Sequence, residues 1–310
     1  MNGRKPWPSG KTFAFTVFDD PDGDTRFARE YVYPFLADLG FRTTKSVWTI
    51  GPLRETNSHG ETCADRSFRE NAQALQTRGF EIGYHSAAPH SCTREEVIES
   101  LERFREYFGH YPVAMANHYN ADAMYWGQAR LSGKAQRAIY NAMTRGKNKE
   151  RFCGQVEGSP YFWGDICRER IRYCRNLVYR DMNTLKACPY MPYHDPERPY
   201  VREWYSSAEG AECWSFNRTI AEANQDQLEA EGGLCIMYTH FGKGFDERGK
   251  LNQRFVDLMT RLSRKNGWFV PVSTMLDYVR EQNGARVITP EERDRLEWSW
   301  LANKCFYGTS

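Results

Sequence analysis

The sequence contains no long hydrophobic run, and no stretch approaches the length of apolar chain that crosses a bilayer. Its first residues, Met-Asn-Gly-Arg-Lys-Pro-Trp-Pro, also lack the apolar segment of a secretory signal. We therefore expect no membrane span and a cytoplasmic location.

Net charge of either sign is nearly absent. Lysine and arginine number 42 against 40 acidic residues, a formal charge of +2, and no basic block stands out. Neither a nucleic-acid groove nor binding to an anionic membrane is expected from such a balance.

The nine cysteines include no C-x-x-C pair, their number is odd and their spacing is irregular. This pattern excludes an obvious disulfide framework or zinc ribbon and favours reduced, partly buried thiols.

What is present is an ordinary globular composition, with 310 residues, 40% hydrophobic and 26% charged. We expect a single catalytic domain over residues 1–310.

Apolar patterning predicts alternating strands and helices. Strands are expected at 13–18, 46–50, 80–84, 112–116, 234–238 and 268–272, and helices at 27–39, 68–75, 93–108, 251–265 and 274–280. The helix from Thr93 has the strongest signal, a capping box with Glu96. Alternation of apolar strands with helices predicts an α/β fold with a parallel sheet or barrel.

Candidate catalytic residues follow these strands. Because the carboxyl ends of parallel strands meet at one edge, the fold would gather there the following side chains: Asp19, Asp20, His85, His90, His118 and His240. A plainer interpretation remains open, in which the acids belong to a solvated turn with Pro21 to Asp24 and each histidine is a polar residue at a strand end.

A carboxylate and two imidazoles are the ligand set of a catalytic zinc site with one position left for water. Such an ion acidifies the water and polarises a carbonyl, a second carboxylate can accept the proton, and a histidine can protonate a leaving amine. The candidates listed above supply a residue for each task.

The sequence resembles the NodB-homology polysaccharide deacetylases, which include chitin and peptidoglycan deacetylases. The likeness lies in Phe-Asp-Asp after a strand (18–20), Gly-Tyr-His-Ser (83–86), Tyr-Thr-His (238–240) and the segment 267–273. It implies a distorted (β/α) barrel of about seven strands. By position it also implies catalytic Asp19 and His240, and a divalent ion, expected to be zinc, on Asp20, His85 and His90.

Two departures from the family pattern concern the site. His85 and His90 are five residues apart instead of four, and the expected Arg-x-Pro-aromatic motif is replaced by Ala116-Asn117-His118-Tyr119. His118 is therefore an alternative to His90 as the third ligand, and Asn117 and His118 are also candidate substrate contacts.

The segment 119–232 has no alignable counterpart in that family. It is rich in Tyr, Trp and Arg, and Trp214 is its candidate substrate contact, because aromatic faces stack on sugar rings. We expect a large insertion, serving either as a substrate lid or as a packed extension.

The resulting hypothesis is a metal-dependent hydrolase that removes an N-acyl group, most simply acetyl, from an amino sugar or saccharide. Two alternatives remain, a cyclic-amide or ureide amidohydrolase on the same fold and a non-catalytic carbohydrate-binding protein. A cytoplasmic location would favour a sugar nucleotide, a lipid-linked intermediate or a small saccharide as the substrate.

Overall fold

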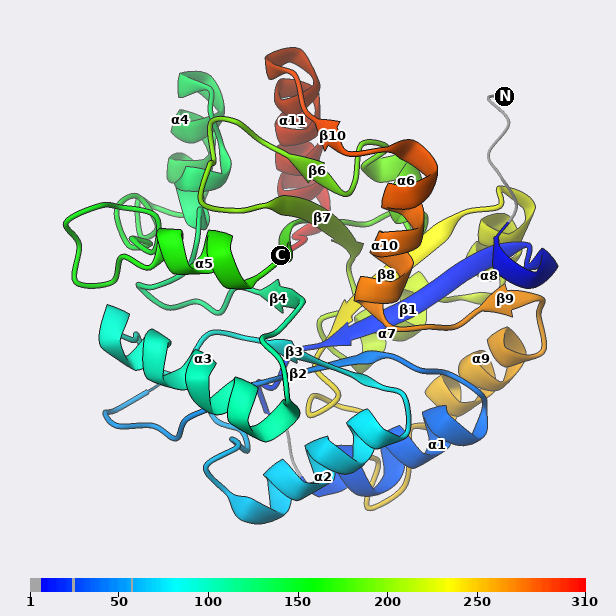
Figure 1. The fold of residues 1–310 in the computed structure, drawn as a ribbon. Helices are drawn as coiled ribbons and strands as arrows, with labels where there is room; N and C mark the ends of the chain where they lie inside the picture. The colour runs from blue at the N-terminus through cyan, green and yellow to red at the C-terminus, as the bar shows by residue number, and fades with distance from the viewer. Residues whose placement is uncertain (1–6, 24–25, 57) are drawn as a thin grey trace.

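Seven parallel strands close into a barrel in the computed structural model, which describes residues 7–23, 26–56 and 58–310 (Figure 1). Around the barrel they follow in the order β1 (Phe13–Asp19), β2 (Thr44–Val47), β3 (Glu81–Tyr84), β4 (Ala114–Ala116), β5 (Tyr173–Tyr179), β7 (Glu203–Ala208) and β8 (Leu234–Thr239). The circle closes where β8 pairs with β1, from Ala14 opposite Leu234 to Asp19 opposite Thr239. The predicted α/β barrel of about seven parallel strands is confirmed.

Three short strands lie beside the barrel. β6 (Tyr193–His194) runs antiparallel to β7, β10 (Arg286–Val287) pairs with β6, and β9 (Gly267–Trp268) pairs with the start of β1. The strand expected at 268–272 is shorter than predicted, because Pro271 is the N-cap of a helix that begins at Val272.

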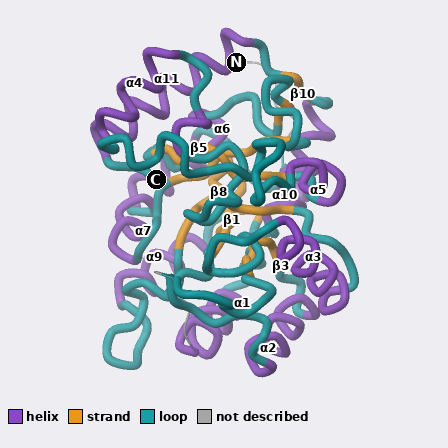
Figure 2. Tube along the Cα trace, turned by 90° about the vertical axis from the view of Figure 1, so that its left-hand side faces the viewer, coloured by secondary structure: helices purple, strands orange, loops and turns teal. Residues whose placement is uncertain are grey.

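Helices cover the outside of the barrel (Figures 1 and 2). Those in the first half are α1 (Tyr33–Asp38, preceded by a π-helical turn, Ala28–Val32), α2 (Arg66–Thr77), α3 (Arg94–Phe108), α4 (Lys134–Met143) and α5 (Gly164–Arg170). The second half contributes α6 (Thr184–Ala187), α7 (Cys213–Thr219), α8 (Glu222–Ala230), α9 (Gln253–Ser263), α10 (Val272–Asn283) and α11 (Pro290–Tyr307). The 3₁₀ turns are Pro8–Gly10 and Gly127–Arg130.

The capping box predicted for the helix after Thr93 is present at the start of α3. The Thr93 side chain accepts from the Glu96 N–H, and the Glu96 carboxylate accepts from the Thr93 N–H at 2.8 Å. These bonds satisfy two donors that a helix start otherwise leaves unpaired. Gly109 ends the helix in the left-handed region, with φ of 83°.

The segment 119–232 contributes to the barrel itself. It supplies two of the seven barrel strands, β5 and β7, together with β6 and the helices α4 to α8. The segment treated as an insertion in the sequence is therefore partly barrel, and its remaining parts pack around it. α4 lies beside the C-terminal helix α11 in both views (Figures 1 and 2).

All nine cysteines are free. Within the described part of the chain, none of the helices combines the length and the apolar character needed to cross a bilayer.

Candidate active site

The carboxyl ends of the barrel strands surround a cavity of about 420 Å³. Asp20 and Asp22 follow β1, His85 follows β3, Asn117 and His118 follow β4, and His240 follows β8. All of these residues line the cavity, and so does Arg175 of β5. The parallel barrel thus brings together residues that are more than 200 positions apart in the sequence.

Asp22 lies between three histidines. Its Oδ1 is 3.1 Å from His118 Nε2, and its Oδ2 is 3.2 Å from His85 Nε2 and 3.7 Å from His240 Nε2. Burial raises the pKa of Asp22, but hydrogen bonds from His118 and His85 and their charges outweigh it and hold the pKa below its usual range. Asp22 is therefore ionised at neutral pH.

Asp22, His85 and His118 fit a divalent metal ion. One ligand atom from each lies within 4.8 Å of the other two. Tetrahedral zinc with bonds of 2.0–2.1 Å spaces its ligand atoms about 3.3 Å apart. Here His118 lies 3.1 Å from one oxygen of Asp22 and His85 lies 3.2 Å from the other, so each imidazole is near that spacing from the carboxylate. The Nδ1 atoms of both histidines have no hydrogen-bond partner among the described residues, while His118 Nε2 also lies 3.0 Å from the Ser58 hydroxyl.

Asp20 is bound by Arg175 through both carboxylate oxygens, at 3.1 Å (Oδ1) and 2.5 Å (Oδ2). Burial raises the pKa of Asp20, but the Arg175 charge, with His85 and His240, lowers it overall. Asp20 Oδ1 also lies 3.6 Å from His85 Nδ1. The sequence analysis missed Arg175, although a charged residue inside the apolar run Tyr-Cys-Arg-Asn-Leu-Val-Tyr was a signal for an inward-facing functional group.

Asp19 does not line this cavity. Its Oδ1 accepts the Phe241 N–H at 2.8 Å, and its Oδ2 accepts from the Tyr33 hydroxyl at 2.5 Å and from Lys45 Nζ at 3.0 Å. Asp19 is 1% exposed, and these bonds connect β1 to β2, to α1 and to the chain after β8. Its surroundings are those of a structural carboxylate.

His240 faces the cavity with one nitrogen. Its Nδ1 is 2.6 Å from the Ala211 carbonyl oxygen, so this nitrogen is assigned the proton, while Nε2 lies 3.4 Å from the Tyr238 hydroxyl. Burial lowers the pKa of His240 to about 4. The neutral ring therefore offers Nε2 as a proton acceptor at neutral pH.

His90 lies in a different group, with Cys92 and Glu96. Its Nε2 is 3.8 Å from Glu96, a carboxylate already engaged by Arg54 and by the N-terminus of α3. His90 does not line the cavity that contains His85. The sequence left His90 and His118 as alternatives for the third metal ligand. Of these two, it is His118 that lies beside His85.

The predicted substrate contacts divide in the same way. Asn117 and His118 line the cavity. The Asn117 side chain also donates through Nδ2 to the Met124 carbonyl and accepts the Met124 N–H at Oδ1, and these two bonds hold the loop after β4. Trp214 is 60% exposed, stacks with Arg218 and lies outside the cavity.

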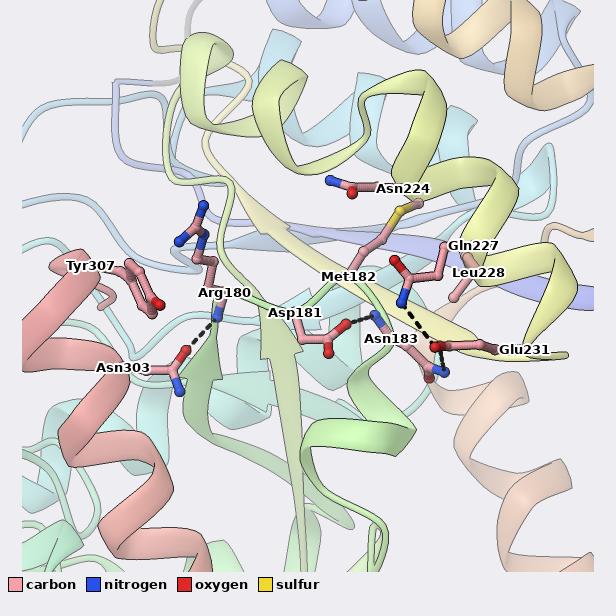
Figure 3. Close-up of a pocket in the computed structure, with 10 residues that line it drawn as sticks. All are labelled: Arg180, Asp181, Met182, Asn183, Asn224, Gln227, Leu228, Glu231, Asn303 and Tyr307. Carbon is pink, nitrogen blue, oxygen red and sulfur yellow. Dashed lines mark hydrogen bonds between the residues drawn. The ribbon is translucent and has the colours of Figure 1, made fainter. Parts of the chain in front are cut away.

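A second cavity, of about 400 Å³, lies between the chain after β5, α8 and α11 (Figure 3). Its polar groups bond to one another, for example Gln227 to Glu231 at 2.9 Å and the Arg180 N–H to Asn303 at 3.0 Å. None of its lining residues is a histidine, a cysteine or a predicted site residue. We therefore place the functional site in the cavity at the strand ends.

No protein-family model and no curated protein sequence matches the chain. Among solved structures, it is similar to a protein described as a polysaccharide deacetylase from Mycobacterium smegmatis, with 14% identity, 92% of this chain and 96% of the other covered, and a TM-score of 0.49. A second such deacetylase, from Pseudomonas aeruginosa PAO1, has 13% identity, 91% and 96% coverage and a TM-score of 0.48.

Puue allantoinase is also similar, with 12% identity, 91% and 95% coverage and a TM-score of 0.46. Other similar structures include two peptidoglycan deacetylases, a further polysaccharide deacetylase, a family 4 acetyl xylan esterase and a GH57-type branching enzyme. Because these TM-scores lie below 0.5, the assignment of the fold rests on the strand pairing described above.

Proposed function

We propose that the protein is a metal-dependent hydrolase of amide C–N bonds that removes an acyl group, most simply acetyl, from an amino sugar of small size. The observation that carries this proposal is the group Asp22, His85 and His118 next to Asp20 in one cavity at the strand ends. This ligand set shares His85 with the set expected from the sequence and replaces Asp20 and His90 by Asp22 and His118.

A divalent ion held by these three residues, zinc or a similar ion, would polarise the amide carbonyl and make a water molecule more acidic. Asp20 lines the cavity and is kept ionised by Arg175, so it is placed to accept the proton of the attacking water. Asp19, for which the sequence predicted this role, has both oxygens engaged away from the cavity.

His240 remains the proposed proton donor to the leaving amine. Because its Nδ1 is held by the Ala211 carbonyl, Nε2 is the nitrogen that exchanges protons in the cavity. Because burial lowers the pKa of His240 to about 4, Nε2 carries no proton in the resting site. The proton that it would give to the amine is therefore the one that Asp20 takes from the attacking water, and on Nε2 that proton is acidic enough to pass to an amine.

The lining supports a sugar as substrate. It contains the aromatic rings of Tyr119, Trp126, Tyr140 and Tyr238, with Arg130 on one face of Trp126 and Arg175 on one face of Tyr238. A volume of about 420 Å³ suits a monosaccharide or disaccharide, since small-ligand sites usually measure ~300–1,000 Å³.

The test combines metal analysis of the purified protein with acetate release from a panel of N-acetyl sugars. We expect about one zinc-type ion per chain and acetate release that a chelator abolishes. In a matched variant, Asp22→Asn, we expect both to be lost. Acetate release from a protein that holds no metal would refute the mechanism.

A second candidate is a cyclic-amide or ureide amidohydrolase that works without metal. It is favoured by one observation, that 3.1 and 3.2 Å are also normal hydrogen-bond lengths between Asp22 and histidine N–H groups. Chelator-insensitive ring opening of an imide or allantoin-like compound, without acetate release from any sugar, would establish this candidate instead.

A further inference from the structure

Arg130 is a buried cation that lines the candidate active-site cavity. It ends the 3₁₀ turn Gly127–Arg130, is 2% exposed, and its guanidinium carbon lies 3.1 Å from the centre of the Trp126 ring and 4.9 Å from that of Trp300. The Nε and Nη2 atoms have no hydrogen-bond partner within the described ranges. Two aromatic rings thus hold in place a charged group that has no anion of its own.

The other buried arginines of the described chain differ from Arg130 in this respect. Arg175 binds Asp20, Arg198 binds Asp195 and Glu297, and Arg293 binds Asp195 and Glu197. No ion pair of Arg130 is present within the described residues. A buried charge without a partner is strongly unfavourable, so its presence at a cavity points to an anion supplied from outside.

Lys304 of α11 brings a second positive charge to the same cavity. Its Nζ donates to the Thr309 carbonyl at 2.7 Å, and within the described chain it forms no ion pair with a carboxylate. Lys243 adds a third cation, exposed at the rim. The two acidic side chains that line the cavity are already committed, Asp20 to Arg175 and Asp22 to the histidines. Ser310 also lines it, and its backbone oxygen accepts from Trp300 Nε1 at 3.1 Å.

We propose that the substrate carries an oxyanion, a carboxylate or a phosphate, that binds Arg130 and Lys304 while the acyl amide faces Asp22, His85 and His118. This inference deepens the proposed function and rests on it. A guanidinium presents paired N–H groups in the geometry that these oxyanions accept. The neutral N-acetyl sugars would then be poor ligands compared with their acidic or phosphorylated counterparts.

The experiment is equilibrium binding by calorimetry with four probes: N-acetylglucosamine, N-acetylglucosamine 6-phosphate, N-acetylmuramic acid and inorganic phosphate. For the wild type we expect the preferred anionic sugar to bind at least about tenfold more tightly than the neutral one. Preference for the 6-phosphate identifies a phosphate as the anion, and preference for the muramic acid identifies a carboxylate.

Three variants locate the anion. Arg130→Gln should weaken binding of the anionic sugar at least about tenfold, and Arg130→Lys should weaken it less, since the charge remains but the paired donors are lost. Arg202→Gln removes an exposed arginine outside this cavity and should leave the affinity unchanged. If Arg130→Gln does not fold, Lys304→Gln decides, with an expected loss of severalfold.

Equal affinity for the neutral and anionic sugars, or an unchanged affinity in Arg130→Gln or Lys304→Gln, would overturn the anion site. That failure differs from failure of the proposed function. Loss of the anion site leaves acetate release from a neutral sugar to be measured, whereas a protein without hydrolytic activity still reports anion binding at Arg130.

Discussion

Arg175 holds Asp20 through two hydrogen bonds, one to each carboxylate oxygen, although the two residues are 155 positions apart in the chain. Both side chains are buried and line the candidate active-site cavity. The pair joins β5 to the chain just after β1, which are not neighbours in the barrel. It keeps a carboxylate ionised at a place where burial alone would favour its protonation.

Arg175→Met is expected to lower the free energy of unfolding by about 3–5 kcal/mol, because it leaves the Asp20 charge buried without its partner. Urea unfolding at pH 7 measures this change. Arg202→Met removes an exposed arginine and serves as the matched control, for which we expect less than about 0.5 kcal/mol. The double variant Asp20→Asn, Arg175→Met should lose less stability than Arg175→Met alone.

The variants Asp19→Asn and Asp20→Asn should have different effects, because Asp19 is expected to stabilise the fold and Asp20 to take part in turnover. Asp19→Asn removes the charge beside the buried Lys45 and is expected to cost about 2–4 kcal/mol of stability while the folded fraction keeps its turnover. Asp20→Asn should lower kcat by at least about a hundredfold and leave sugar binding in place.

Thermal unfolding and kcat, measured below the melting temperature of each variant, give the two readouts. A natively stable Asp19→Asn protein that is as inactive as Asp20→Asn would return the catalytic role to Asp19. A protein that only binds carbohydrate would show no turnover in any form, and neither substitution would change that.

His118→Ala and His90→Ala test which histidine accompanies His85. We expect His118→Ala to lose most of its bound metal, as measured by elemental analysis after dialysis, since one of three protein ligands is gone. His90→Ala should retain the metal content of the wild type. The reverse result would restore the ligand set expected from the sequence.

Anion binding should weaken as the pH rises above about 8. Burial and the Arg130 charge lower the pKa of Lys304 to about 8, against the weaker opposing influence of Glu209 and Cys305. Lys304 therefore loses its proton near that pH in the free protein, and a bound anion shifts the loss to a higher pH.

Calorimetry with N-acetylglucosamine 6-phosphate between pH 7.5 and 10 measures the effect, because the phosphate itself remains a dianion in that range. In Lys304→Gln the fall in affinity near pH 8 should be absent, and a fall at higher pH is left to Arg130, because burial lowers the pKa of Arg130 to about 9. A wild-type affinity that does not change with pH would show that Lys304 does not contribute its charge to the anion.

Part of this fold follows directly from sequence patterning, because β1, β4 and β8 are short apolar runs and α3 begins with a capping box. β2 is Thr-Lys-Ser-Val, and it overlaps the strand expected at 46–50 only at Ser46 and Val47. β5 and β7 were not recognised, since Arg175 interrupts the first and Glu203 begins the second. The position of Asp22 beside three histidines was not predicted, because its neighbours Pro21 and Gly23 are typical of a plain turn. A local sequence pattern also cannot predict whether His90 or His118 lies beside His85, because their relative positions are set by how the barrel closes.

The pairing of β1 with β8 has a consequence for synthesis of the protein. From Asp19 to Thr239 the ribosome adds 220 residues, which takes roughly 10–45 s at ~5–20 residues per second. During that time one edge of β1, a strand buried along its whole length in the finished barrel, has no strand to pair with. We expect nascent chains that stop before residue 234 to be aggregation-prone and dependent on chaperones.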